Sequence, residues 1–240
     1  MKILLLGYGK MGKIIGQIAE SRGHLLAGKI NLDNLTDLDK INPAEVDVVI
    51  EFSQPESAVA NITWAIERGI PVVSGTTGWL EHRPQIEKLT QEKNGAFFYA
   101  SNYSIGVNIF FKVNEFLAKL INETSSYEVA IEEIHHTEKK DAPSGTAITL
   151  AEGIIQNLKG KTDWHLTGQV DANEHSIPIT AKRIDPAPGT HIITYSSEID
   201  TLEISHTAHS RQGFALGAVL VAEWIKNKKG VLSMNDFLSF

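Results

Sequence analysis

Residues 3–12, ILLLGYGKMG, join a continuous apolar run to three glycines at fixed spacing. An apolar run of this kind is typical of a strand covered on both faces. The glycines at positions 7, 9 and 12 follow as G-x-G-x-x-G. The first permits a tight turn, the second leaves room for a pyrophosphate, and the third lets a helix approach the strand. A helix expected over residues 10–21 would offer its free N–H groups to phosphate. The stretch predicts a dinucleotide-binding loop rather than an ordinary glycine turn.

The first hundred residues alternate short apolar segments with helical ones. Strands are expected over residues 3–6, 25–30, 46–52, 70–74 and 96–100. Helices are expected over residues 10–21 and 55–68, and between the fourth and fifth strands. Strands separated by helices of this length imply parallel βαβ units. We therefore predict an α/β fold with a Rossmann-type parallel sheet.

The pattern changes after residue 102. A long helix is expected over residues 105–121, and strands over 127–134, 177–184, 191–196 and 198–205, with one helix, 145–158, among them. This pattern predicts a second, α+β domain on an open mixed sheet, residues 103–210. The last helix, 214–226, is expected to pack back on the first domain. Residues 1–102 and 211–240 would then form a discontinuous dinucleotide-binding domain.

The composition is that of an ordinary globular protein. The 240 residues are 42% hydrophobic and 21% charged, and none is cysteine, which excludes disulfides, thiolate nucleophiles and cysteine-bound metals. We expect no metal. The longest apolar run, residues 214–224, is too short to span a membrane, and residues 3–6 are better explained by a buried strand than by a signal peptide. The net charge of −7 argues against nucleic acid as a partner. A cytoplasmic protein is expected.

Two further loops follow predicted strands. They are Ser74-Gly-Thr-Thr-Gly78 and Ala100-Ser-Asn-Tyr-Ser104. Ordinary turn chemistry would explain either loop alone. Both loops, however, fall at the carboxyl ends of strands, where α/β sheets bind ligands, and this favours a nicotinamide pocket.

The coenzyme preference stays open from the sequence. An acidic residue at the end of the second strand would bind the ribose hydroxyls of NAD. Asn31 stands near that position and Asp33 lies two residues on, whereas Lys29 would suit a 2′-phosphate.

The segment 132–147, EEIHHTEKKDAPSGTA, concentrates groups that suit a small anion. His135 and His136 end a predicted strand, so only one of them need face a ligand unless the chain bends. Lys139 and Lys140 follow, and such cations repel one another unless an anion joins them. Ser144 and the two residues after it begin a helix whose N–H groups suit a carboxylate. A structural loop is the alternative, but the concentration favours a catalytic segment.

Six segments in chain order resemble the dihydrodipicolinate (4-hydroxy-tetrahydrodipicolinate) reductases of bacterial lysine biosynthesis: GYGKMG, EFSQPES, SGTTGW, ASNYSIGVN, EEIHHTEKKDAPSGTA and SHTAHSRQGFALGA. The run HH-x-x-K-x-D-A-P-S-G-T-A is specific, whereas the glycine loop alone is not. The resemblance implies a Rossmann domain, a mixed-sheet substrate domain, and a homotetramer joined through those sheets. It also implies NADH or NADPH as coenzyme and hydride transfer to C4 of a cyclic, unsaturated imine dicarboxylate.

The resemblance also implies roles for individual residues. His135 looks like the general acid or base and Lys139 like the proton donor. The expected substrate-binding residues are His136, Ser144, Gly145, Thr146 and Arg211, of which Arg211 would equally suit a surface salt bridge. The expected cofactor-binding residues are Gly7, Tyr8, Gly9, Lys10, Met11, Gly12, Asn31, Phe52, Ser53, Gly75, Thr76, Thr77, Ala100, Ser101, Asn102 and Tyr103.

The chain departs from the family pattern in two places. Thr137 and Glu138 stand where many members carry basic residues, which weakens the local positive field. Asn31 replaces the acid often seen after the second strand.

Two other interpretations compete. Another two-domain dehydrogenase, such as an aspartate dehydrogenase, should lack the HH-x-x-K run. A non-catalytic NAD-sensing module would need an interaction surface such as a basic, DNA-reading helix. The negative net charge of the chain argues against such a helix.

Overall fold

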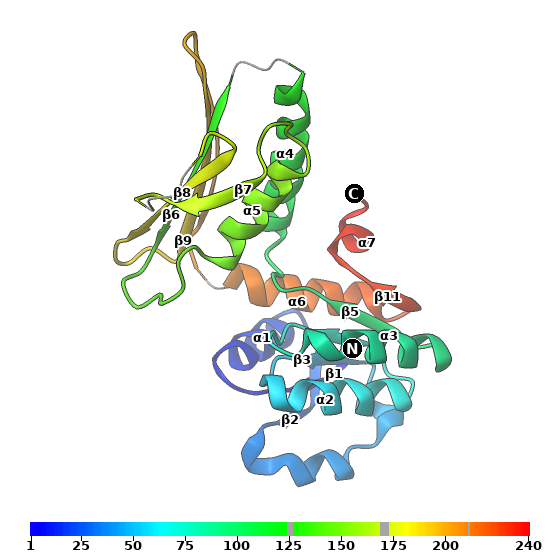
Figure 1. Ribbon diagram of the computed structural model, residues 1–240. Coiled ribbons are helices and arrows are strands. Elements are labelled where there is room, and N and C mark those ends of the chain that lie inside the picture. Colours follow the sequence, from blue (N-terminus) through cyan, green and yellow to red (C-terminus); the bar gives the residue numbers. More distant parts are fainter. Residues whose placement is uncertain (124–126, 169–172, 211) are drawn as a thin grey trace. The chain divides into compact units, whose positions relative to one another are not determined.

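The computed structural model describes residues 1–123, 127–168, 173–210 and 212–240 (Figure 1). The chain divides into two compact units. Unit 1 comprises Met1–Ile105 with Gln212–Phe240, and unit 2 comprises Gly106–Arg211.

Unit 1 is built on a six-stranded parallel sheet in the order β11-β5-β4-β3-β1-β2. The strands are β1 (Lys2–Leu6), β2 (Leu25–Ile30), β3 (Val48–Glu51), β4 (Val72–Ser74), β5 (Ala96–Tyr99) and β11 (Gly230–Leu232). Every residue of β3, β4 and β5 is buried, as expected of strands covered on both faces. The parallel arrangement brings the loops after β1, β3, β4 and β5 to one edge of the sheet.

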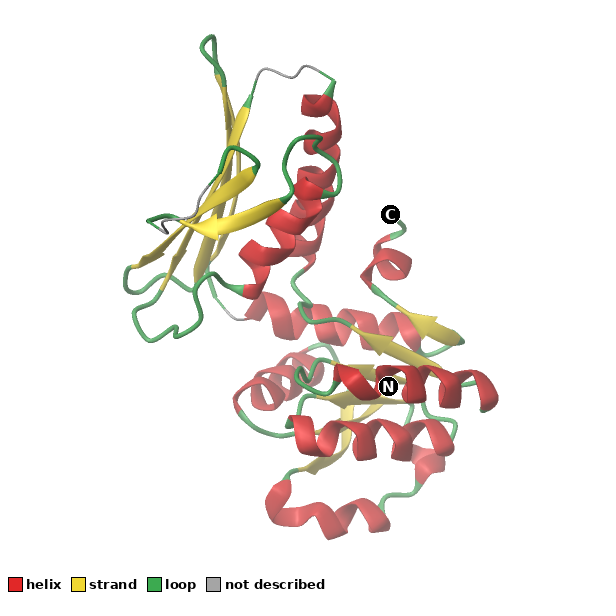
Figure 2. Cartoon of the chain, viewed as in Figure 1, coloured by secondary structure: helices red, strands yellow, loops and turns green. Residues whose placement is uncertain are grey.

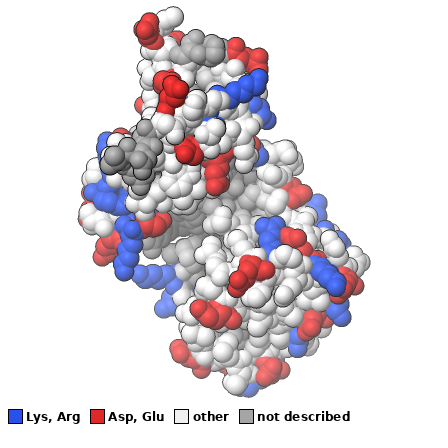
Figure 3. Space-filling model, viewed as in Figure 1, with Lys and Arg blue, Asp and Glu red and all other residues white. Residues whose placement is uncertain are grey.

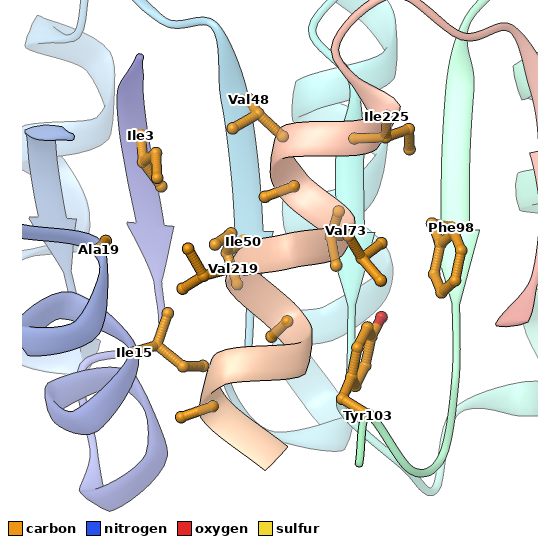
Figure 4. Packing of buried hydrophobic residues seen from close by; sticks show 14 of the residues in the cluster. Ile3, Ile15, Ala19, Val48, Ile50, Val73, Phe98, Tyr103, Val219 and Ile225 are labelled. Atoms are coloured by element: carbon orange, nitrogen blue, oxygen red, sulfur yellow. The ribbon is translucent and has the colours of Figure 1, made fainter. Parts of the chain in front are cut away.

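Helices cover both faces of this sheet. They are α1 (Lys10–Ser21), α2 (Pro55–Glu67), α3 (Arg83–Glu92), α6 (Gln212–Ile225) and α7 (Met234–Leu238), with 3₁₀ turns η1 (Leu32–Lys40), η2 (Pro43–Glu45) and η3 (Leu80–His82). Helices α1 and α6 pack in one hydrophobic cluster, and α2 and α3 in the other. Figure 4 shows Val219 and Ile225 of α6 lying over the strands. Helix α6, from the second segment of unit 1, therefore completes the core of that unit.

Unit 2 is built on a five-stranded mixed sheet in the order β10-β9-β6-β8-β7. Its elements are α4 (Ile105–Asn122), β6 (Glu128–His135), α5 (Gly145–Ile155), β7 (Asp163–Leu166), β8 (Ser176–Arg183), β9 (Gly189–Ser196) and β10 (Thr201–Ala208). Strand β9 pairs antiparallel with β6 and β10, whereas β8 pairs parallel with β6 and β7. Helices α4 and α5 lie on one face of the sheet (Figure 2). The predicted fold class, a Rossmann-type sheet with a second α+β domain, is confirmed.

Some boundaries differ from the sequence prediction. The last strand of unit 2 begins at Thr201 rather than 198, because a turn held by Ser197 and Asp200 occupies the residues before it. Helix α6 begins at Gln212, two residues earlier than predicted, and it is followed by β11 and α7. The unpredicted β7, β11 and η1 are short or irregular, and such segments carry little periodic signal.

No helix in the described part of the chain is long and apolar enough to cross a membrane. On the face drawn in Figure 3, Lys and Arg side chains are interspersed with Asp and Glu. This mixture agrees with the modest negative charge of the sequence.

Candidate active site

The glycine loop after β1 has the geometry that its spacing predicts. Gly7 has φ +99°, and a Cβ there would lie 2.1 Å from the carbonyl oxygen of Phe52. A Cβ on Gly12 would lie 2.1 Å from the carbonyl oxygen of Gly7. At Gly9, in contrast, a Cβ would meet nothing within 4 Å. Packing therefore explains the outer two glycines, whereas the middle one leaves open space.

That space lies at the N-terminus of α1. Gly9 is the N-cap, no side chain caps the helix, and the first turn contains no acidic residue. The free N–H groups and the positive end of the helix dipole suit a bound phosphate. The residues present thus fit the pyrophosphate of a dinucleotide.

A hollow opens beside the loop. Five of the predicted cofactor-binding residues line it: Gly7, Gly9, Asn31, Phe52 and Ser53. Six residues without a prediction complete the lining: Ile30, Leu32, Leu35, Gln54, Ser57 and Asn61. Leu32 and Leu35 come from η1 and are largely exposed, so they offer apolar surface to a flat ring. Sequence analysis missed them because η1 itself was not predicted.

The lining of this hollow carries no acidic side chain among the residues that the structure describes. Asn31 begins η1, and its N–H donates to Oδ1 of Asn34. The ammonium of Lys29 lies 5.1 Å from the centre of the Tyr8 ring and 3.7 Å from a Glu20 carboxylate oxygen. The carboxylate that would select a free ribose 2′-hydroxyl is therefore missing from the described lining.

The other predicted cofactor residues of the glycine loop differ in exposure. Lys10 is exposed, Tyr8 and Met11 are half-buried, and Gly12 is buried. Lys10 is therefore the one of these side chains that stands most open to a ligand.

The loops after β4 and β5 are closely joined to the loop after β3. A Cβ on Gly75 would lie 2.3 Å from the Phe52 ring. Thr76 is buried, and its hydroxyl donates to Glu51. Tyr103 is also buried, and its hydroxyl donates to the carbonyl oxygen of Ser74 at 2.6 Å. These two side chains are engaged within the protein.

The remaining predicted positions of the two loops differ in exposure. Thr77 and Ser101 are exposed, Asn102 is half-buried with its amide oxygen accepting from the N–H of Ser104, and Ala100 is buried. Thr77 and Ser101 are thus the most open to a ligand.

In unit 2, His135 is the last residue of β6 and is buried beside an acidic residue and a second histidine. Its Nδ1 lies 3.6 Å from Oε2 of Glu133, and Nε2 of His191 lies 3.8 Å from the same oxygen. The two imidazole rings are 5.2 Å apart. Nδ1 of His135 has no hydrogen-bond partner among the described residues. We call Glu133, His135 and His191 the buried cluster.

Burial keeps both imidazoles neutral near pH 7. Desolvation lowers the pKa of His135, although the nearby carboxylate of Glu133 opposes it. Desolvation, reinforced by the nearby His135, lowers the pKa of His191 to about 4. A neutral imidazole with an unpartnered ring nitrogen is able to accept a proton or donate one.

Glu133 connects this cluster to the start of α5. Its Oε2 accepts from the N–H of Ser144 at 3.0 Å, and its Oε1 accepts from Arg183 at 3.2 Å. The hydroxyl of Ser144 accepts from the N–H of Ala147 and lies 3.1 Å from Nε2 of His191. Ser144 is therefore the cap of α5, and its role in substrate binding stays a prediction.

The next two residues are more open. Gly145 is exposed, and a Cβ there would meet nothing within 4 Å. Thr146 is half-buried. Both belong to the first turn of α5, where N–H groups suit a carboxylate.

Lys139 lies in the loop after β6, where it is held by its own segment. Its ammonium donates to both carboxylate oxygens of Asp141, each at 2.8 Å. The hydrogen bond lowers the pKa of Asp141. Arg183 donates to the backbone carbonyls of Lys139 and Asp141. The anion that the cationic segment was expected to require is thus partly supplied by Asp141.

His136 lies beyond the end of β6, on a shallow hollow. Thr137, Glu138, Asp185, Pro186 and Pro188 line the hollow with it. The backbone N–H and hydroxyl of Thr137 both donate to Asp185 and lower its pKa. The two adjacent histidines therefore have different environments, as the strand geometry predicts. The remaining predicted substrate residue, Arg211, lies outside the described residues.

No metal was expected from the sequence, yet one ligand atom from each member of the buried cluster lies within 4.8 Å of the others. Glu133 already accepts from Ser144 and Arg183, and His191 pairs with Ser144. The cationic Arg183 beside the carboxylate disfavours a second cation. The existing partners of the cluster therefore argue against a bound metal ion there.

Three important partners were missed from the sequence: Glu133, Arg183 and His191. Glu133 had a local signal, because it stands two residues before His135 and so shares its face of the strand. Arg183 and His191 come from β8 and β9, and their approach follows from sheet pairing alone.

A doubly wound parallel sheet with a glycine loop at a free helix start is typical of NAD(P)-dependent oxidoreductases. The family model for the N-terminus of dihydrodipicolinate reductase matches residues 1–103, and the model for its C-terminus matches residues 106–238. The chain belongs to the dihydrodipicolinate reductase family.

Individual relatives agree with this assignment. The 4-hydroxy-tetrahydrodipicolinate reductase of Christiangramia forsetii is 49% identical over 239 residues, which cover 100% of this chain and 98% of the relative. That of Methanococcoides burtonii is 36% identical and covers 95% and 85%.

Solved structures share the fold. The dipicolinate-bound dihydrodipicolinate reductase from Paenisporosarcina sp. TG-14 has a TM-score of 0.77 at 21% identity, with 99% of both chains covered. The amine dehydrogenase from Mycobacterium smegmatis has a TM-score of 0.59 at 10% identity, with 97% and 94% covered.

Proposed function

We propose that the chain reduces (2S,4S)-4-hydroxy-2,3,4,5-tetrahydrodipicolinate to tetrahydrodipicolinate with NADH or NADPH, in lysine and diaminopimelate biosynthesis. The whole-length relative at 49% identity, a 4-hydroxy-tetrahydrodipicolinate reductase, carries the proposal. The ligand of the Paenisporosarcina structure, dipicolinate, supports a small dicarboxylate as substrate.

The residues of unit 1 bind the coenzyme in this proposal. The open space at Gly9 and the N–H groups of α1 hold the pyrophosphate, and the hollow lined by Asn31 and Ser53 holds neighbouring parts of the dinucleotide. The bound coenzyme supplies the hydride.

The residues of unit 2 bind the substrate and move the proton. The N–H groups of Gly145 and Thr146, together with the hydroxyl of Thr146, hold one carboxylate, and His136 contacts the substrate. The C4 hydroxyl first leaves as water, together with a proton from an adjacent ring carbon, which gives a cyclic, unsaturated imine dicarboxylate. Hydride addition at C4 of that ring then leaves an electron-rich ring that must take up one proton. Lys139 donates that proton, and neutral His135 acts as general acid or base beside it. A positioned donor typically accelerates such a step by ~10²–10⁴-fold.

Each of the two units has one role in this proposal. Unit 1 is the dinucleotide-binding domain, and unit 2 is the substrate-binding and oligomerisation domain. We further propose a cytoplasmic homotetramer, for which the family resemblance is the support. Light scattering on the purified protein tests the tetramer, and a monomeric mass would reject it.

A single assay tests the activity. The protein is mixed with NADH or NADPH and the aldol product of pyruvate with aspartate semialdehyde, and absorbance of the reduced coenzyme is followed. We expect a loss of absorbance that depends on both protein and aldol product. Parallel runs with the two coenzymes measure the preference, and no loss with either would reject the proposed activity.

A further inference from the structure

Glu51 is a completely buried carboxylate at the carboxyl end of β3, among the loops expected to bind the coenzyme. Its exposed fraction is 0%, although it ends a strand of three aliphatic residues. Leaving a buried carboxylate without partners costs far more free energy than leaving a neutral polar group. The partners of Glu51 therefore indicate why the residue is there.

The two carboxylate oxygens of Glu51 accept four hydrogen bonds from neutral groups. Oε1 accepts from the backbone N–H at 3.0 Å and from the hydroxyl of Ser53, and from the hydroxyl of Thr76 at 2.7 Å. Oε2 accepts from the hydroxyl of Ser74 at 2.7 Å. A carboxylate offers about four acceptor positions, and the four bonds match that number, with three of them at Oε1.

These bonds tie two loops of the sheet edge to one fixed point. Ser53 lines the hollow beside the glycine loop, and Asn61, from the same hollow, donates to the Ser53 hydroxyl at 3.1 Å. Ser74 is the last residue of β4, and Thr76 belongs to the loop that follows, in which Gly75 lies against Phe52. The backbone adds a link, because the N–H of Gly75 donates to the carbonyl oxygen of Glu51.

The loop after β5 joins the same network. Tyr103 donates its hydroxyl to the carbonyl oxygen of Ser74, and its ring centre lies 5.4 Å from that of Phe52. A shift of the Glu51 carboxylate would therefore be transmitted to all three loops that follow β3, β4 and β5.

The geometry points to Glu51 as a positioning residue for the coenzyme: its carboxylate sets the relative placement of the loops at 52–54 and 74–77, and thereby the affinity for the dinucleotide. This inference rests on the proposed function. Glu51 itself has no exposed surface, so it acts through Ser53 and Thr76 rather than by touching the ligand.

Two substitutions at Glu51 distinguish the effect of its hydrogen bonds from the effect of its side-chain volume. In Glu51→Gln, the amide oxygen takes the place of Oε1 and keeps three accepted bonds, while the NH₂ group faces Ser74, whose hydroxyl is free to turn and accept. Glu51→Leu keeps a similar volume but removes every acceptor. We expect the dissociation constant for NADH to stay within about threefold in Glu51→Gln and to rise by about tenfold or more in Glu51→Leu.

A third substitution tests the network if Glu51→Leu does not fold. Ser74 is fully buried and so does not reach the ligand, yet it supplies one of the four bonds. We expect Ser74→Ala to fold and to weaken NADH binding by about threefold to tenfold. Glu67→Gln, at the exposed end of α2, removes the same charge at a distance from the loops and serves as the matched control.

NADH fluorescence enhancement gives the dissociation constants, and thermal melts establish folding. Weakened binding in Glu51→Leu or Ser74→Ala, with rescue in Glu51→Gln, supports the positioning role. Unchanged binding in folded Glu51→Leu and Ser74→Ala overturns it while leaving the proposed reductase intact. If the unaltered protein binds NADH but does not oxidise it with the aldol product, the proposed activity fails and the positioning role stands. If the unaltered protein binds neither NADH nor NADPH, both are rejected.

Discussion

The ammonium of Lys139 lies 2.8 Å from both carboxylate oxygens of Asp141, within the same short loop. Arg183 bonds the backbone of both residues and reaches Glu133 of the buried cluster. The loop is therefore fastened to the element that carries His135. A side chain held in this way is pre-positioned, which lowers the cost of placing it against a substrate.

Replacing Lys139 should damage turnover more than binding. If the ammonium donates the proton, we expect Lys139→Ala to lower kcat by about 10²–10⁴-fold with a smaller change in KM, because a positioned donor acts mainly in the transition state. Initial rates at varied substrate concentration measure both constants. Lys140→Ala is the control, since Lys140 is the exposed neighbour in the same loop. Near-normal turnover in Lys139→Ala would reject the role.

The glycines of the first loop should respond in opposite ways to one added methyl group. In Gly9→Ala, the Cβ enters open space, so the fold should keep its stability while the dissociation constant for NADH rises by about tenfold or more. In Gly12→Ala, the Cβ meets the carbonyl oxygen of Gly7, and overpacking of this kind costs about 1–3 kcal/mol of unfolding free energy. Urea unfolding and coenzyme titration distinguish the two. Equal loss of stability in both variants would count against a ligand-shaped space at Gly9.

The sequence was sufficient for the main features of unit 1. The apolar strand and the glycine spacing are local patterns, and the structure places the predicted residues Gly7, Gly9 and Ser53 on one hollow. Glu51 escaped notice because a single acid after an apolar strand resembles an ordinary strand end. Its importance appears only when Ser74 and Thr76 are brought beside it by the pairing of β3 with β4.

In unit 2, too, the contacts between residues distant in the sequence could not be predicted from local patterns. His135 and Lys139 stand four residues apart, and the sequence alone predicts them as site residues. Arg183 lies 48 residues and His191 lies 56 residues after His135 in the sequence, so no local periodicity connects them. The parallel pairing of β6 with β8 and the antiparallel pairing with β9 bring them together.

The first turn of α5 should contribute to substrate affinity. If Thr146 holds a substrate carboxylate, we expect Thr146→Val to raise KM by about tenfold with little change in kcat, since uniform binding is lost. Thr149→Val, one turn further along the same helix, is the matched control, because the Thr149 hydroxyl is bonded to the carbonyl oxygen of Gly145. Steady-state kinetics with varied substrate measure the effect. An unchanged KM in Thr146→Val would argue against the carboxylate assignment.

The buried cluster should make stability depend on pH below neutrality. Burial lowers the pKa of His191 to about 4, whereas the usual value is about 6.5. Between these values the unfolded chain binds a proton that the folded chain does not. The free energy of unfolding therefore falls as the pH falls through this window, by about 1.4 kcal/mol for each pH unit from a single such group.

His191→Gln should remove this contribution while keeping a nitrogen donor near the Ser144 hydroxyl, with which Nε2 of His191 pairs. We expect the difference in unfolding free energy between pH 7.5 and pH 5.0 to shrink by about 2 kcal/mol relative to the unaltered protein, because protonation of one buried imidazole no longer opposes folding. Urea denaturation at the two pH values measures it. His175→Gln, an exposed histidine of the same unit, is the control and should retain the full pH dependence. The dependence that remains in His191→Gln belongs in part to His135, whose pKa burial also lowers. If His191→Gln lost as much stability at pH 5.0 as the unaltered protein, His191 would not be a neutral, desolvated imidazole.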